Sequence, residues 1–164
     1  MTKEINNYNS TIGTSFVFEF PLLQDYNYFI QAVDLPEVSM SEISTPFRNL
    51  QGMLPNNKIE YPVLILTYLL SEDWSNYKHI VNWFYRVRRG KEDITDVMSD
   101  AVLHITNSNK NIKNKIVFES AFPVSISGIA FSSTDDATEV ITSTMSFAYQ
   151  QFYFIDEKPE AYAR

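Results

Sequence analysis

Alternating apolar and polar positions predict that most of this chain forms β-strands. Phe16, Phe18 and Phe20 alternate with smaller or polar residues, and this period of two places three aromatic rings on one face of a strand. Residues 28–35 form a second run of strand-forming residues that ends before a proline. Because a turn-like stretch at residues 22–27 separates the two runs, they are predicted to pair as a hairpin.

The run at residues 58–70 is apolar at both sets of alternating positions. A strand with two apolar faces has to be covered on both of them. In a chain of 164 residues, the second cover is predicted to be a helix lying across the sheet or a neighbouring subunit.

One amphipathic helix is predicted between Ser71 and Gly90. Ser71 can cap the amino end of this helix, and Gly90 can end it. Apolar residues recur at helical spacing between them: Trp74, Tyr77, Ile80, Val81, Phe84 and Val87. This apolar stripe is expected to cover one face of a sheet, with Asn76 elsewhere on the helix surface.

The carboxyl-terminal half of the chain returns to strand patterns. Strands are predicted at residues 101–106, 115–119 and 124–131. The final run, residues 139–155, is the longest β candidate, and its partner is expected to be residues 124–131 or residues 58–70. Its mostly apolar face carries Ile141, Met145, Phe147, Tyr149 and Tyr153.

These elements predict a single domain at residues 15–155. The predicted fold is mainly β, a barrel or sandwich of two packed antiparallel sheets with one principal flanking helix. Residues 1–14 are expected to form a flexible polar leader and residues 156–164 a polar tail.

Residues 37–57 follow neither period and contain several turn-forming residues. They nevertheless carry large apolar side chains: Val38, Met40, Ile43, Phe47, Leu50, Met53 and Leu54. A disordered segment rarely carries so many apolar groups, and a long structureless loop is uncommon in a compact domain. Two interpretations stay open: an arm or hairpin that packs against a neighbouring subunit, and a loop folded back over its own core.

Composition narrows the class of protein. The hydrophobic fraction of 45% and aromatic fraction of 15% exclude disorder for most of the chain. A formal net charge of -7 disfavours tight binding to nucleic acids and anionic lipids, although a mildly acidic chain is also common among soluble proteins. No apolar run approaches the length of a membrane span, so a cytosolic origin and no membrane partner are expected.

The residues that usually carry catalysis are scarce. The chain has no cysteine, and His79 and His104 fall on different predicted elements without metal-ligand spacing. Asp135, Asp136 and Glu139 form the tightest acidic group, but they lack the spacing of a calcium loop, and a solvated turn is favoured. We therefore predict no catalytic residue, no cofactor and no metal.

One basic cluster stands out in this acidic chain. Arg86, Arg88 and Arg89 fall in the last turn of the predicted helix, where they oppose the helix dipole. They are also candidates for an intersubunit salt bridge, because an acidic subunit that stacks on itself needs positive charge at the joint. With Asp135 and Asp136 they form the predicted set of stacking or lumen contacts.

The order of elements resembles the tail-tube proteins of contractile-tailed (T4-like) bacteriophages. The resemblance is carried by an aromatic first segment ending in AVDLP at residues 32–36, an arm, a strand leading into a helix with Trp74 and Trp83, and a closing hairpin. That hairpin begins with FPVSISGI at residues 122–129 and continues, after an acidic turn, as VITSTMSFAY at residues 140–149.

The resemblance implies a structural virion protein and no enzymatic activity. It implies hexameric rings that stack into a tail tube, with sheath and baseplate proteins as partners. DNA would pass through the lumen without specific binding, in a virion tail made in the host cytoplasm. A baseplate-proximal tube initiator or an injection-system tube protein would share this fold. Outside this family, a monomeric β-barrel ligand-binding module stays open, and an enzyme working through carboxylates alone is disfavoured.

Overall fold

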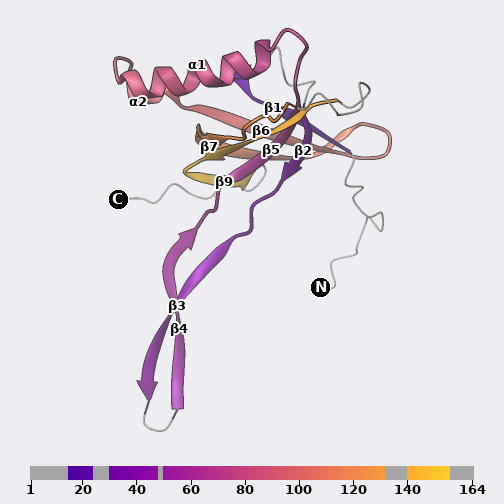
Figure 1. Cartoon of the computed structure of the whole chain (residues 1–164). Coiled ribbons are helices and arrows are strands. Elements are labelled where there is room, and N and C mark those ends of the chain that lie inside the picture. The colour runs from indigo at the N-terminus through magenta and orange to yellow at the C-terminus, as the bar shows by residue number, and fades with distance from the viewer. Residues whose placement is uncertain (1–14, 24–29, 48–49, 132–139, 156–164) are drawn as a thin grey trace.

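The computed structural model describes residues 15–23, 30–47, 50–131 and 140–155 (Figure 1). Its strands are β1 (Phe16–Glu19), β2 (Ile30–Asp34), β3 (Ser39–Phe47), β4 (Leu50–Glu60), β5 (Leu64–Leu69), β6 (Ser99–Thr106), β7 (Ile112–Ile126), β8 (Thr142–Ala148) and β9 (Gln151–Phe154). Its helices are α1 (Ser75–Arg89) and α2 (Ile94–Val97). The predicted leader and tail, residues 1–14 and 156–164, lie outside the described residues.

Two antiparallel sheets share the long strand β7. Its first part pairs with β6 and β9, and β6 pairs in turn with β1. Its last part, from Phe122, pairs with β8, which is followed in the same sheet by β5 and β2. The predicted fold class, two antiparallel sheets with one principal helix, is confirmed.

β7 passes from one sheet to the other at Ser120. This residue has a φ of 53°, in the left-handed region that a residue with a side chain rarely adopts. Its N–H donates to Asp100 Oδ1 at 2.9 Å, beside a register shift between Ser99 and Ala101 on β6. A bulge of this kind bends and twists a strand, and here it coincides with the change of sheet.

Aromatic and aliphatic side chains from both sheets form one core. Phe20 lies at the centre, fully buried, with its ring 5.1 Å from the rings of both Trp83 and Phe147. Buried neighbours from four other strands include Leu64, Leu66, Leu103, Ile116, Phe118 and Met145. The predicted apolar face of the final run is confirmed for Met145, Phe147 and Tyr149, which are all buried.

The helix is confirmed, but its amino end and its buried face differ from the prediction. α1 begins at Ser75, and Gly90 ends it with a φ of 57°, as expected of a left-handed C-cap. Its buried residues are Asn76, Ile80 and Trp83 rather than a stripe centred on the apolar positions. The prediction was wrong about Asn76 because it sorted residues by polarity alone, whereas this amide is buried with hydrogen-bonding partners.

Asn76 ties the start of α1 to the end of β5. Its Nδ2 donates to the carbonyl of Leu69 at 2.7 Å, and its Oδ1 accepts from the N–H of Tyr77 at 2.9 Å and from the Ser71 hydroxyl at 3.0 Å. Ser71 therefore does not cap the helix as predicted. It binds the buried amide that orients α1 over the sheet.

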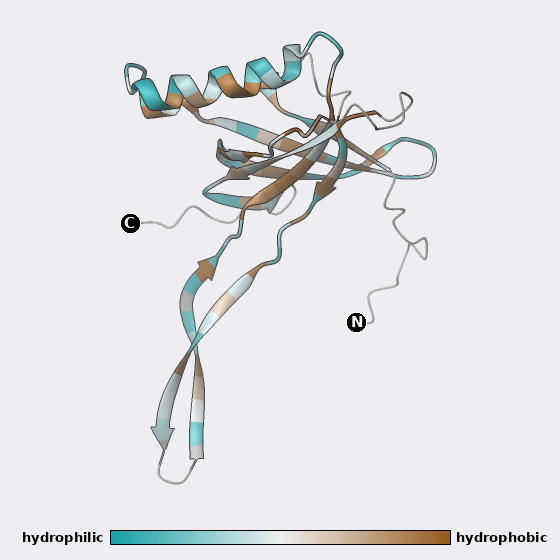
Figure 2. Cartoon of the chain, viewed as in Figure 1, coloured by the Kyte–Doolittle hydropathy of each residue, from teal (hydrophilic) through white to brown (hydrophobic). Residues whose placement is uncertain are grey.

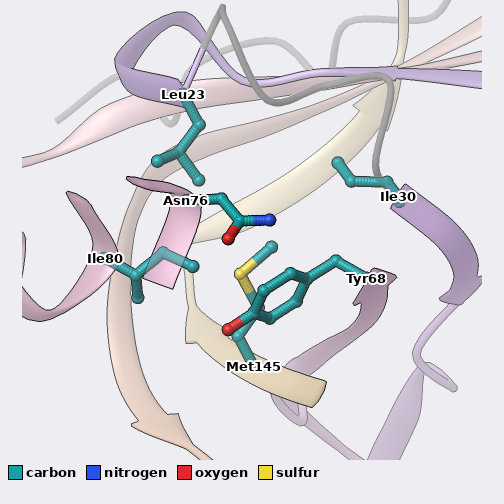
Figure 3. Close-up of a pocket in the computed structure, with 6 residues that line it drawn as sticks. All are labelled: Leu23, Ile30, Tyr68, Asn76, Ile80 and Met145. Atoms are coloured by element: carbon teal, nitrogen blue, oxygen red, sulfur yellow. The ribbon is translucent and has the colours of Figure 1, made fainter. Parts of the chain in front are cut away.

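Figure 3 shows Asn76 and Tyr68 on one small cavity that is otherwise lined by Leu23, Ile30, Ile80 and Met145. The cavity has a volume of about 10 Å³, which is the space of a single water molecule. Burial raises the pKa of the Tyr68 hydroxyl above its ordinary value, and the Ser143 hydroxyl opposes that rise only in part.

One predicted pairing of strands is wrong. β1 pairs with β6 and β2 with β5, so the two segments lie at opposite ends of the strand order and form no hairpin. After β1 the chain makes a tight turn in which the N–H of Leu23 donates to the carbonyl of Phe20, and both side chains enter the core. The final run, predicted as one strand, consists of two strands, β8 and β9. The predicted partners are confirmed for β8, which pairs with β5 on one side and with β7 on the other.

Replacing Asn76 by alanine should lower the free energy of unfolding by about 3 kcal/mol, because it removes the hydrogen bonds of a buried amide to the Leu69 carbonyl and the Tyr77 N–H and leaves a cavity. Asn82→Ala, on the exposed side of the same helix, is the matched control and should change it by less than about 0.5 kcal/mol. Urea denaturation followed by circular dichroism measures both. Equal effects would contradict the role given to Asn76.

Candidate assembly surface

Strands β3 and β4 form a hairpin that projects from the body of the molecule, on the side away from α1 (Figure 1). Within the described residues these two strands pair only with each other. The hairpin contains most of residues 37–57, the segment for which the sequence left two interpretations open.

The described apolar side chains of this segment are exposed. Val38, Met40, Ile43, Met53 and Leu54 each expose between 50% and 62% of their surface. Figure 2 shows hydrophobic residues interleaved with polar ones along the hairpin. Phe47 and Leu50 pair with each other at the end of the hairpin, and their side chains lie outside the described residues. A loop folded over its own core is therefore wrong for the described part, whereas contact with another subunit stays a prediction.

The register of the hairpin sorts its apolar residues onto two faces. Ile43 is paired with Leu54, and directly paired residues of an antiparallel ribbon point to the same side. Met53, one residue earlier, is paired with Ser44 and so points to the other side. The face of Ile43 and Leu54 also carries Gly52, which has no side chain, so this face presents an aliphatic pair next to a notch.

Polar side chains hold the two strands together near the base and near the tip. Asn56 Nδ2 donates to the Ser41 hydroxyl at 2.8 Å, and Gln51 Nε2 donates to the Ser44 hydroxyl at 2.5 Å. An isolated two-stranded hairpin with solvent on both faces is only marginally stable in water. The exposed aliphatic side chains and the weak stability of such a ribbon both favour a partner that covers it.

Of the five other predicted contact residues, the structure describes the three arginines in the last turn of α1. Arg86 forms an ion pair within the chain, with its Nη2 2.6 Å from Glu92 Oε2, and this contact lowers the pKa of the Glu92 carboxyl. Arg88 and Arg89 are exposed at the end of α1. Asp135 and Asp136 lie outside the described residues. The role of the five residues in stacking or in a lumen stays a prediction, although the ion pair engages Arg86 locally.

Sequence reasoning missed an aromatic cluster at the start of α1. The ring of Trp74 stacks on Phe131 at 5.5 Å and meets Tyr77 edge-on at 5.7 Å. Phe131 is 68% exposed and lies beyond the end of β7. The sequence was misleading here, because it predicted a strand over residues 124–131, whereas β7 ends at Ile126 and Phe131 lies outside it.

Neither histidine has the surroundings of a metal ligand. His104 is buried on β6 with its Nε2 2.9 Å from Glu19 Oε2, and His79 lies on the exposed side of α1. Within the described ranges, no three His, Asp or Glu side chains are grouped so that they could hold a metal ion. In the same part of the chain, none of the helices has the length and apolar character needed to span a membrane.

The fold is that of tube proteins of contractile injection systems. No family model and no curated protein matches the sequence. A chain from the anti-feeding prophage cap, described as a tube-terminating cap, matches with a TM-score of 0.70 at 12% identity, over 93% of this chain and 95% of that one. A chain from the sheath–tube complex of an extracellular contractile injection system (PVC) has a TM-score of 0.66 at 11% identity, over 90% and 92%.

More distant structures share the same architecture. Hcp1 from Flavobacterium johnsoniae has a TM-score of 0.50 at 11% identity, and covers 85% of this chain and 93% of its own. These comparisons support the tube-protein class that the sequence resembles, and they do not single out T4-like phages.

We expect the hairpin to be the least protected β-structure of the unassembled chain, because both of its faces are open to water. Amides of β3 and β4 should exchange with deuterium at least about ten-fold faster than those of β5 and β8, which lie in the core sheet. Hydrogen exchange read by mass spectrometry measures this. Equal protection in a verified monomer would show that the hairpin is stable without a partner.

Proposed function

We propose that this chain is a structural subunit of a tail tube, which forms stacked rings around a central channel. The rings are hexameric, and DNA passes through the channel on ejection without specific binding. Tail sheath and baseplate proteins are the partners outside the ring, and the assembled protein resides in a phage tail. The function is mechanical, and no catalytic residue takes part in it.

The observation that carries this proposal is the projecting hairpin. Its aliphatic side chains have no cover from the described part of their own chain, although they are numerous enough to need one. A second copy of the chain supplies that cover in a self-assembling protein. The tube fold, present over more than nine-tenths of the chain, supports the same conclusion from an independent direction.

The acidic balance of the chain fits a channel for DNA. A formal net charge of -7 gives a surface that repels phosphate groups, so a nucleic acid can move past it without being held. A tube protein of an injection system, or a tube initiator next to the baseplate, would show the same fold and the same hairpin. The injection-system alternative differs from the main proposal in the molecule that passes through the channel, and the initiator differs in its position along the tube.

A monomeric ligand-binding module is the alternative from another class. Binding sites for small molecules usually have volumes of several hundred Å³ and enclose most of their ligand. The cavity of Figure 3 has about 10 Å³, and the groove between Leu22 and the exposed side of α1 has about 330 Å³ with Arg86 and His79 at its border. The core cavity is far below that size and the groove reaches it, so the groove is the place where this alternative would put a ligand.

Purified protein should form rings or rods in negative-stain electron microscopy, and its light scattering should rise with concentration. Replacing residues 42–54 by an Asn-Gly turn should keep the circular dichroism spectrum of the core and abolish the rods, because the sheets do not depend on the hairpin for pairing. Rods that persist after this replacement would contradict the role of the hairpin. A strict monomer of the unaltered chain, even with a baseplate template, would contradict the proposed function.

A further inference from the structure

The chain carries a second exposed apolar surface, far from the hairpin in sequence. We call it the aromatic patch, and it consists of Trp74, Tyr77 and Phe131, whose rings contact one another through Trp74. Phe131 exposes 68% of its surface. The carbonyl of Ile141 accepts from the N–H of Leu70 at 2.9 Å, which ties the start of the closing strand to the end of β5, just before the turn that carries Trp74. Contiguous exposed apolar surface of this kind marks an interaction site.

The backbone presents Trp74 in a conformation that costs free energy. Trp74 has a φ of 61° and a ψ of 14°, the left-handed region that bulky residues avoid. Hydrogen bonds hold it there on both sides: its N–H donates to the Ser71 carbonyl at 2.9 Å, and the next N–H, that of Ser75, donates to Asp73 Oδ1 at 3.2 Å. Strained residues of this kind cluster at functional sites, so the conformation of Trp74 supports a role for its ring in binding.

The two apolar surfaces lie at opposite ends of the molecule. Trp74 directly precedes α1, and Figure 1 shows α1 at the end of the molecule away from the projecting hairpin. A hairpin therefore cannot reach the patch of its own chain. A contact between two different surfaces of identical chains is heterologous, and it repeats from copy to copy instead of closing into a dimer.

We propose that the face of the hairpin with Ile43 and Leu54 docks on the aromatic patch of the next copy. This inference rests on the proposed self-assembly and names the receiving surface. Aliphatic side chains meet aromatic rings, and the paired positions Ile43–Leu54 and Thr45–Gly52 bring no charge into the contact. The notch at Gly52 leaves room for a ring, since only the Thr45 carbonyl lies within 4 Å of a Cβ placed there, at 3.5 Å.

Cysteine cross-linking tests the contact directly, because the chain has no cysteine of its own. Leu54→Cys and Phe131→Cys are purified separately, mixed in equal amounts under conditions where the cysteine-free chain forms rods, and then oxidised. A disulfide needs Cα atoms within about 7 Å, so only a true neighbour reacts efficiently. We expect a covalent dimer that contains one chain of each variant, identified by mass spectrometry.

Met53→Cys mixed with Phe131→Cys is the matched control. Met53 is the neighbour of Leu54, equally exposed but on the other face of the hairpin. Its yield of mixed dimer should be lower by about ten-fold or more, because the control thiol points away from the receiving surface. Equal yields would overturn the assignment of the face, and a dominant dimer of Leu54→Cys with itself would replace the proposed contact by hairpin-to-hairpin pairing.

The outcomes separate this inference from the proposed function. Rods of the cysteine-free chain without a link between positions 54 and 131 would overturn the docking alone and leave the tube function standing. Absence of rods, with or without a baseplate template, would overturn the function and the docking with it. If Phe131→Cys itself does not assemble, Tyr77→Cys takes its place on the same patch, and the same two outcomes decide.

Discussion

The structure depends on a single strand that belongs to two sheets. β7 pairs with β6 and β9 in its first part and with β8 in its last part, and the change occurs where the Ser120 N–H binds Asp100. Because both sheets include β7, their inner faces lie against each other, and the rings of Phe118 and Phe147 enter one core. α1 then covers this core from the side, with Trp83 against Phe20 and Phe147.

A polar contact sets the position of the helix within this apolar core. Asn76 is 1% exposed, and its amide forms hydrogen bonds with the Leu69 carbonyl at the end of β5 and with the Ser71 hydroxyl in the turn that precedes α1. Hydrophobic packing alone would allow α1 to slide or rotate over a smooth surface, whereas a buried amide with fixed partners permits one register. The same turn places Trp74 in its strained conformation, so the anchoring of the helix and the display of the aromatic patch are consequences of one local arrangement.

The sequence predicts those features that arise from local patterns. The strand faces of Met145 and Phe147, the end of the helix at Gly90 and the need for two packed sheets all follow from periodicity and from the properties of single residues. The pairing of β1 with β6 could not be predicted, because alternation tells which face is buried and not which strand lies alongside. The sequence predicted an apolar segment at residues 37–57 that needs to be covered. Which of its side chains share a face depends on the pairing register of β3 and β4, and that register is known only from the structure. The aromatic patch was missed for a related reason, since it gathers residues from two segments that are far apart in the sequence.

In the proposed assembly, the exposed hairpin and the distant patch would together control how subunits are added. A ribbon that is marginal in water must be ordered when it docks, so part of the contact free energy is used for ordering and the first contact between two free subunits is weak. A subunit that binds to the end of an assembly would make the contact between hairpin and patch and also lateral contacts with its ring neighbours. The two kinds of contact together would bind it more tightly than either kind alone. In that assembly, growth from an existing end would be favoured over spontaneous nucleation. The predicted low stability of the free hairpin would then limit association between free subunits through their exposed apolar surfaces.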